Sequence, residues 1–233
     1  MDKKKKLFRL GVLGGMGPMA GIWFQKLIID STPAKKDQDH IQVICFTNPK
    51  IPDRTISLTQ DGGKNYVKEV CKSLNVLAKS GASLVAITCN TAHAKLKEIQ
   101  KNTSLPILDM IDLTVNNVAS NFGSVLILAT EATVREKIYQ SKNDSNKINW
   151  ICPDKRTQQK VSKIIYSIKA GCEKNILENI VSVIKKFDEN SEAVIFACTE
   201  FSLYAEKVRK FVKIPIVDPL EVLAKEVVRL SYK

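Results

Sequence analysis

Two segments of this chain repeat one plan, and this repeat constrains the fold more than any other feature. The first, LVAITCNTAHAKLKEIQKNTSLPILD, spans residues 84–109, and the second, EAVIFACTEFSLYAEKVRKFVKIPIVD, spans residues 192–218. In each, an apolar run ends in a cysteine followed by polar residues, a helical stretch follows, and a Pro-Ile-x-Asp tetrad closes the segment. Pro106 follows Cys89 at the same spacing at which Pro215 follows Cys198. This agreement at several points indicates that one β/α unit was duplicated.

The rest of the chain alternates between strand-like and helix-like segments. We predict strands at 7–13, 41–46, 83–88 and 122–129, and helices at 18–29, 65–79, 92–100 and 174–187, with a loop at 47–59. Such alternation is typical of parallel sheets covered by helices. The predicted fold is therefore α/β, with two pseudo-symmetric duplicated domains, each a parallel sheet flanked by helices, and an active site in the interdomain cleft. We expect residues 1–112 plus 215–233 in the first domain and 113–214 in the second.

Charge and hydropathy exclude several classes of function. The 233 residues carry a formal net charge of +12, but the lysines are spread along helix-like segments and no DNA- or RNA-reading motif accompanies them. We interpret the charge as a solvated surface that attracts small anions, with no nucleic-acid partner. No apolar run has the length of a bilayer span, so no membrane partner is expected. The start, MDKKKKLFRLGVLGGMGP, is interpreted as a tail and a first strand rather than a signal peptide, which predicts a cytoplasmic protein.

The cysteines argue against metal and disulfide chemistry. The chain has six cysteines without a C-x-x-C pair, and only two histidines. We therefore predict no metal site, and thiols throughout in a reducing cytosol. Four of the six are interpreted as small buried core residues, namely Cys45, Cys71, Cys152 and Cys172.

Cys89 and Cys198 have a different context, because each ends an apolar run and is followed by polar residues. Ligands of open parallel sheets bind at the carboxyl ends of the strands. A cysteine at the start of a helix has its pKa lowered from about 8.5 towards neutrality, which suits proton transfer. Two chemistries follow. In one, Cys89 is a nucleophile and His93, one helical turn further on, is its base. In the other, two facing thiols exchange protons with one carbon and invert it.

Four motifs resemble those of the cofactor-independent aspartate/glutamate racemase family, and most closely its aspartate racemases. They are GVLGGMGPMA at 11–20, IPDRT at 51–55, TCNTAH at 88–93 and ACTEF at 197–201. They occur in the family's order over nearly the whole chain. The resemblance implies an isomerase that needs neither pyridoxal phosphate nor metal, forms a homodimer, and acts on a dicarboxylic amino acid. It also implies that Cys89 and Cys198 are the acid/base pair, serving the D- and L-enantiomer respectively.

The resemblance also assigns the other candidate site residues. Glu200 stands where glutamate racemases carry histidine, which favours the aspartate subgroup, and it would assist proton exchange at Cys198, as Asp53 would at Cys89. Arg54 and Lys169 match cations that hold the substrate's side-chain carboxylate, and Arg54 has the planar fork that binds a carboxylate bidentately. Further substrate contacts are expected from Met16, Thr55, Asn90, Thr91, Thr130 and Thr199.

Other functions remain open at this point. Aspartate/glutamate racemisation of broad specificity is one alternative, and a catalytically silent small-anion binding protein of the same fold is another. Hydantoin racemases and malonate decarboxylases share the fold, but a decarboxylase typically keeps one of the two cysteines.

Overall fold

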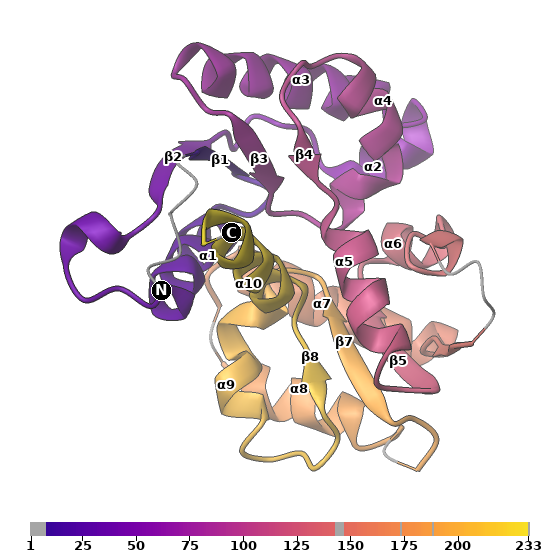
Figure 1. Ribbon diagram of the computed structural model, residues 1–233. Helices are drawn as coiled ribbons and strands as arrows, with labels where there is room; N and C mark the ends of the chain where they lie inside the picture. Colours follow the sequence, from indigo (N-terminus) through magenta and orange to yellow (C-terminus); the bar gives the residue numbers. More distant parts are fainter. Residues whose placement is uncertain (1–7, 143–146, 173, 188, 233) are drawn as a thin grey trace. The chain divides into compact units, whose positions relative to one another are not determined.

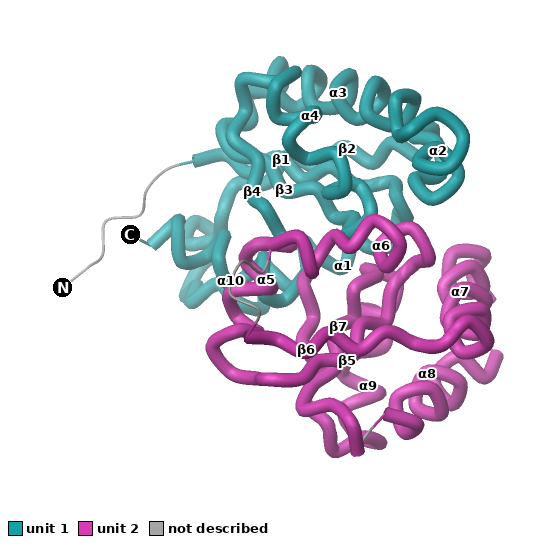
Figure 2. Tube along the Cα trace, turned by 90° about the vertical axis from the view of Figure 1, so that its right-hand side faces the viewer, with its two compact units in different colours: residues 1–110, 220–233 teal, residues 111–219 magenta. Residues whose placement is uncertain are grey.

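The computed structural model describes residues 8–142, 147–172, 174–187 and 189–232, so the first residue of the predicted strand 7–13 lies outside them. The chain divides into two compact units (Figure 2). The first comprises Met1–Met110 and Leu220–Lys233, and the second comprises Ile111–Pro219.

The first unit is built on a parallel four-stranded sheet of order β2-β1-β3-β4. Its elements are β1 (Arg9–Gly14), α1 (Pro18–Ser31), β2 (Gln42–Thr47), α2 (Arg54–Gln60), α3 (Lys64–Lys79), β3 (Leu84–Ile87), α4 (Leu96–Lys101), β4 (Ile107–Leu108) and the C-terminal α10 (Pro219–Ser231), with short 3₁₀ turns at Asp37–Asp39 and Thr91–Lys95. Both α1 and α3 contact β1, and Figure 1 shows them on opposite faces of the sheet. This follows from right-handed crossovers that run in opposite directions along the sheet, from β1 to β2 through α1 and from β2 back across β1 to β3 through α3.

The second unit repeats this arrangement with a parallel four-stranded sheet of order β6-β5-β7-β8. Its elements are α5 (Met110–Ala119), β5 (Ser124–Ala129), α6 (Glu131–Arg135), β6 (Asn149–Ile151), α7 (Lys155–Lys169), α8 (Ile176–Ile184), β7 (Ala193–Ala197), α9 (Ala205–Val208) and β8 (Ile216–Val217), with 3₁₀ turns at Gln140–Lys142 and Phe201–Tyr204. The β7 strand is buried along its whole length, as expected of a parallel strand covered on both faces.

The two sheets have the same strand order, and the predicted α/β class with two duplicated parallel sheets is confirmed. The position of β8 differs from the predicted domain boundary. β8 pairs with β7 and belongs to the second unit, whereas the boundary at residue 215 assigned it to the first domain. The Pro-Ile-x-Asp tetrad therefore closes each sheet as its edge strand, because β4 and β8 both fall within it.

Two local predictions were wrong. The predicted loop 47–59 is helical from Arg54 onward, as part of α2, because Asp53 accepts hydrogen bonds from the backbone N–H groups of Thr55 and Ile56 and so caps a helix. The predicted helix 92–100 begins instead as the 3₁₀ turn Thr91–Lys95 and becomes α-helical only at Leu96.

Candidate active site

In the first unit, the loop after β1 packs tightly against the loop after β2. Gly15 has a φ of +100°, and a Cβ added there would lie 2.4 Å from the backbone carbonyl carbon and oxygen of Asn48. The N–H of Asn48 donates to the carbonyl of Gly14 at 3.2 Å, and its side-chain amide donates to Ser73 Oγ at 2.9 Å. Only glycine fits this contact, so Gly15 allows the loop that carries Met16 to lie against the loop after β2.

Arg54 is buried at the start of α2, with 7% of its surface exposed. Its Nη2 donates to the carbonyl of Met16 at 2.9 Å, and its Nη1 donates to the carbonyl of Pro52 at 3.1 Å. The guanidinium is thus held by backbone of both loops that follow β1 and β2. A buried cation at the carboxyl end of a parallel sheet is suited to attract a carboxylate.

Asp53 and Thr55 take part in the helix start beside Arg54. Asp53 Oδ1 accepts from the N–H groups of Thr55 and Ile56 at 2.9 and 3.1 Å, and Thr55 itself is half-buried. This capping orients the loop and the arginine that follows it. A direct role of Asp53 beside Cys89 stays a prediction.

The end of β3 carries the first candidate cysteine. Cys89, Asn90 and Thr91 are buried, with 5% or less of each exposed. The hydroxyl of Thr88 donates to the carbonyl of Leu13 at 3.1 Å, which ties the end of β3 to β1. The cysteine therefore lies at the carboxyl end of its strand, where it was predicted.

His93 contacts the backbone of Cys89. Its Nδ1 donates to the carbonyl oxygen of Cys89 at 2.8 Å, across the 3₁₀ turn. A carbonyl accepts hydrogen bonds only, so this nitrogen carries a proton. That contact fixes the turn and gives no support to a nucleophile–base pair formed through Nδ1.

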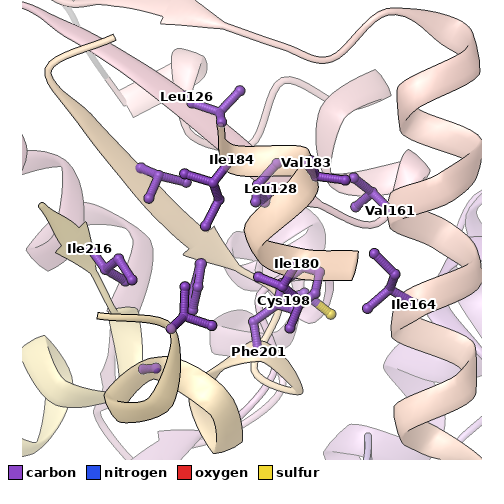
Figure 3. Packing of buried hydrophobic residues seen from close by; sticks show 14 of the residues in the cluster. Leu126, Leu128, Val161, Ile164, Ile180, Val183, Ile184, Cys198, Phe201 and Ile216 are labelled. Carbon is purple, nitrogen blue, oxygen red and sulfur yellow. The ribbon is translucent and has the colours of Figure 1, made fainter. Parts of the chain in front are cut away.

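In the second unit, Cys198 follows β7 directly and is 4% exposed. Figure 3 shows its sulfur among Ile164, Ile180 and Phe201, which belong to the hydrophobic core of this unit. The Sγ donates a hydrogen bond of 2.9 Å to Oε2 of Glu200, a carboxylate that is itself buried. This contact joins a proton donor to a potential base in an apolar environment.

Lys169 is the last residue of α7, and its Nζ lies 3.9 Å from Oε1 of Glu200. The ammonium also lies over the ring of Tyr166, 5.2 Å from the ring centroid. Three residues that were singled out separately in the sequence, Cys198, Glu200 and Lys169, therefore form one continuous series of contacts.

The predicted lowering of a cysteine pKa was wrong for Cys198. Burial in the apolar core raises the pKa of Cys198 well above its ordinary value, the Glu200 carboxylate raises it further, and the Lys169 ammonium acts in the opposite direction. The element after Cys198 is the short 3₁₀ turn Phe201–Tyr204 rather than an α-helix, so no long helix dipole offsets desolvation. The resting group is accordingly a thiol.

Thr130 and Thr199 also lie at strand ends of the second unit and are buried. Thr130 caps α6, because its Oγ1 accepts from the N–H of Thr133 at 3.3 Å. Ser202 and Asp218 were not among the predicted site residues, although Asp218 closes the second Pro-Ile-x-Asp tetrad. The Ser202 hydroxyl donates to Asp218 Oδ1 at 2.7 Å, and both residues are buried, which explains why the closing tetrad ends in aspartate in this unit.

Burial separates the candidate pair from the other cysteines. Cys89 and Cys198 are buried, whereas Cys45 and Cys172 are exposed and Cys71 and Cys152 are intermediate. The prediction that these four are core residues was therefore wrong, since an apolar or helical sequence context does not reveal which face a residue occupies.

Within the described part of the chain, no group of three His, Cys, Asp or Glu side chains is placed to hold a metal ion. Likewise, no helix formed by the described residues is long and apolar enough to cross a membrane.

Comparison with known proteins assigns the chain to a class. A model of the Asp/Glu/Hydantoin racemase family matches residues 13–227, so the chain belongs to this family of racemases. The broad specificity amino-acid racemase RacX of Bacillus subtilis (strain 168) is 28% identical over 226 residues, which cover 94% of this chain and 96% of the relative. The solved structure of Picrophilus torridus aspartate racemase has a TM-score of 0.86 and 33% identity, and the match covers 96% of this chain and 94% of that one.

A more distant structure agrees in fold alone. Glutamate racemase from Francisella tularensis subsp. tularensis SCHU S4, in complex with D-glutamate, has a TM-score of 0.67 at 21% identity, covering 99% of this chain and 81% of that one. The family and the α/β fold expected from the sequence motifs are thus both confirmed.

Proposed function

We propose that the chain interconverts L- and D-aspartate, with Cys89 and Cys198 as the two acid/base groups and without pyridoxal phosphate. The observation that carries this proposal is the pair of buried cysteines at corresponding strand ends of the two duplicated sheets, after β3 and after β7. The aspartate racemase of Picrophilus torridus, at 33% identity, supports aspartate as the substrate.

In the proposed reaction one cysteine, as a thiolate, removes the α-proton, and the other, as a thiol, returns a proton to the opposite face. The S–H bond formed on one side balances the S–H bond broken on the other, so the enzyme ends in the mirror-related protonation state. Glu200 would exchange protons with Cys198 through their 2.9 Å hydrogen bond. The mechanism requires that both thiols reach the α-carbon of one substrate molecule.

Arg54 and Lys169 are proposed to attract the substrate's carboxylates. Asn90, Thr91, Thr130 and Thr199 would orient the amino and α-carboxylate groups by neutral hydrogen bonds, together with Met16 and Thr55. Assignment of the D-enantiomer to Cys89 and of the L-enantiomer to Cys198 belongs to the same proposal, as does a homodimer.

A second candidate function is racemisation of a wider set of amino acids. It is favoured by the similarity to the broad specificity racemase of Bacillus subtilis, which extends over 94% of this chain. A panel of L-amino acids, each incubated with the protein and separated by chiral chromatography, distinguishes the two. Turnover confined to aspartate supports the first, and comparable turnover of neutral amino acids supports the second.

The test of the mechanism uses pure protein, without added cofactor, in deuterium oxide. We expect L- and D-aspartate each to become racemic and to gain deuterium at the α-carbon. Cys89→Ala and Cys198→Ala should each reduce racemisation by about 10³-fold or more, because each removes one proton-transferring group. Cys45→Ala, at an exposed thiol, is the matched control and should keep wild-type activity. Wild-type racemisation by either site variant contradicts the two-base mechanism, and no turnover of any amino acid favours a silent anion-binding protein.

A further inference from the structure

Lys169 contacts Glu200, the carboxylate proposed to exchange protons with Cys198. Its ammonium lies 3.9 Å from Glu200 Oε1, and the other oxygen of that carboxylate accepts the hydrogen bond from Cys198 Sγ at 2.9 Å. The Lys169 side chain is 21% exposed, whereas that of Glu200 is 6% exposed. The series therefore runs from a partly hydrated cation to a buried carboxylate and then to a buried thiol.

The other elements packed around Cys198 present apolar side chains. Ile164 on α7, Ile180 on α8, Leu128 on β5 and Phe201 in the following turn all belong to the same core cluster. The charged groups that act on the thiol are Glu200, which opposes its ionisation, and Lys169, which favours it. The titratable ring of Tyr166 lies against the Lys169 ammonium.

Negative charge on Glu200 or Cys198 is energetically unfavourable in this apolar core. A buried carboxylate is costly unless a cation or hydrogen-bond donors compensate it. When Cys198 has given its proton to a substrate carbon, a thiolate stands within one hydrogen-bond length of the Glu200 carboxylate. Lys169 brings a cation into contact with that carboxylate, from its place at the end of α7.

We propose that Lys169 is a positioning residue for Cys198, acting through Glu200: it holds the carboxylate against the thiol and offsets the charge of the thiolate. This role is additional to the attraction of the substrate's carboxylates proposed above for Lys169, because it acts on the protein's own thiol through Glu200. Its catalytic consequence rests on the function proposed above, but its effect on the thiol is a property of the protein without substrate.

The experiment measures alkylation of Cys198 by iodoacetamide in the full-length, substrate-free protein, read by mass spectrometry of the peptide. The exposed Cys45, in the other unit, gives the reference rate in the same digest. Only the thiolate reacts, so each unit by which the thiol pKa rises slows alkylation tenfold below that pKa. We expect Lys169→Met to slow Cys198 alkylation about tenfold and Lys169→Arg to keep it within about threefold.

Two further variants test the direction of the effect of Glu200 on Cys198 alkylation and the specificity of the effect of Lys169. Glu200→Gln removes the negative charge that opposes ionisation, so Cys198 should react faster than in the wild type. Lys163→Met, at an exposed lysine of the same helix, should leave the rate unchanged. Urea unfolding checks that each variant is folded, and Lys169→Gln replaces Lys169→Met if the latter is not.

Steady-state kinetics separate positioning from substrate clamping. A positioning role lowers kcat for aspartate and for any neutral amino acid turned over, whereas a clamp raises KM for aspartate alone. Unchanged alkylation of Cys198 in both Lys169→Met and Lys169→Gln, or a defect limited to the KM for aspartate, overturns the inference. If the wild type racemises nothing, the proposed function fails while the alkylation series still decides the role of Lys169.

Discussion

Alanine in place of Gly15 tests how the first unit fixes the loop after β1, whose Met16 carbonyl accepts a hydrogen bond from Arg54. The backbone of Gly15 has a φ of +100°, which an L-residue rarely adopts, and the added Cβ would lie 2.4 Å from the Asn48 carbonyl group. Asn48 cannot easily retreat, since its side-chain amide is bonded to Ser73 Oγ. Displacing this contact would move the carbonyl of Met16, which accepts the hydrogen bond from Arg54.

The magnitude follows from two separate costs. The unfavourable backbone conformation costs about 1–3 kcal/mol, and overpacking against main chain adds about 1–3 kcal/mol. Gly15→Ala should therefore lower the free energy of unfolding by about 2–6 kcal/mol. Gly62 is the matched control, because its φ is +67° but a Cβ there would meet nothing within 4 Å. Gly62→Ala carries the conformational cost alone, about 1–2 kcal/mol.

Urea unfolding followed by circular dichroism measures both variants, and chiral chromatography measures aspartate turnover at a concentration of urea where both are folded. The difference between their free energies of unfolding measures the cost of the close contact between the loops after β1 and β2. Only Gly15→Ala should lose activity. Equal destabilisation of the two proteins, or full activity in Gly15→Ala, would refute the reasoning.

Three further changes test other parts of the molecule. Arg54→Lys keeps a positive charge but loses the planar fork, so the KM for aspartate should rise about tenfold, whereas the exposed Arg135→Lys should leave it unchanged. Asp154→Ala removes the N-cap of α7, where the carboxylate accepts from Thr157 and its pKa is lowered by those bonds. The Tm should fall by about 2–4 °C. This stabilisation is present above about pH 4 and disappears as pH falls through the lowered pKa, so wild type and variant should converge in acid. Burial raises the pKa of Cys198, so the rate in the direction that needs its thiolate should still rise between neutral and alkaline pH; a plateau below neutrality would contradict the assignment.

The strands were predictable because the parallel sheet is buried on both faces. Continuous apolar runs such as Val-Ala-Ile before Cys89 have no amphipathic alternative, and the predicted 83–88 and observed Leu84–Ile87 differ only at the ends. Helix α2 was missed because Pro49 and Pro52 indicate a loop. Both prolines precede the N-cap, however, where they leave the helical hydrogen bonds of residues after Asp53 intact.

The twin cysteines were predictable for a different reason: a duplication repeats spacing, and spacing is visible in one sequence. The contact between Lys169 and Glu200 was not. This contact joins the C-terminal end of α7 to Glu200 in the segment after β7. It depends on how the helix and the strand pack together, which neither segment shows by itself. Burial of the thiol, which reverses the expected direction of its pKa, likewise belongs to tertiary structure.

Duplication preserved the two thiols but not the groups that act on them. Two positions after Cys198 stands Glu200, a carboxylate bonded to the thiol, whereas two positions after Cys89 stands Thr91, which carries no charge. The two thiols therefore have unequal neighbours, and the pKa of Cys198 is set by its own burial and by the charges of Glu200 and Lys169. If the two-cysteine mechanism holds, its two directions need opposite protonation states of this unequal pair. The kcat values of the L-to-D and D-to-L directions should then depend differently on pH. The ratio of the two kcat/KM values, in contrast, is fixed at every pH by the equilibrium between the mirror-image substrates. The two kcat/KM values therefore show the same pH dependence, which reports the ionisations of the free enzyme. The difference between Thr91 and Glu200 is expected to appear when kcat and KM of the two directions are compared separately.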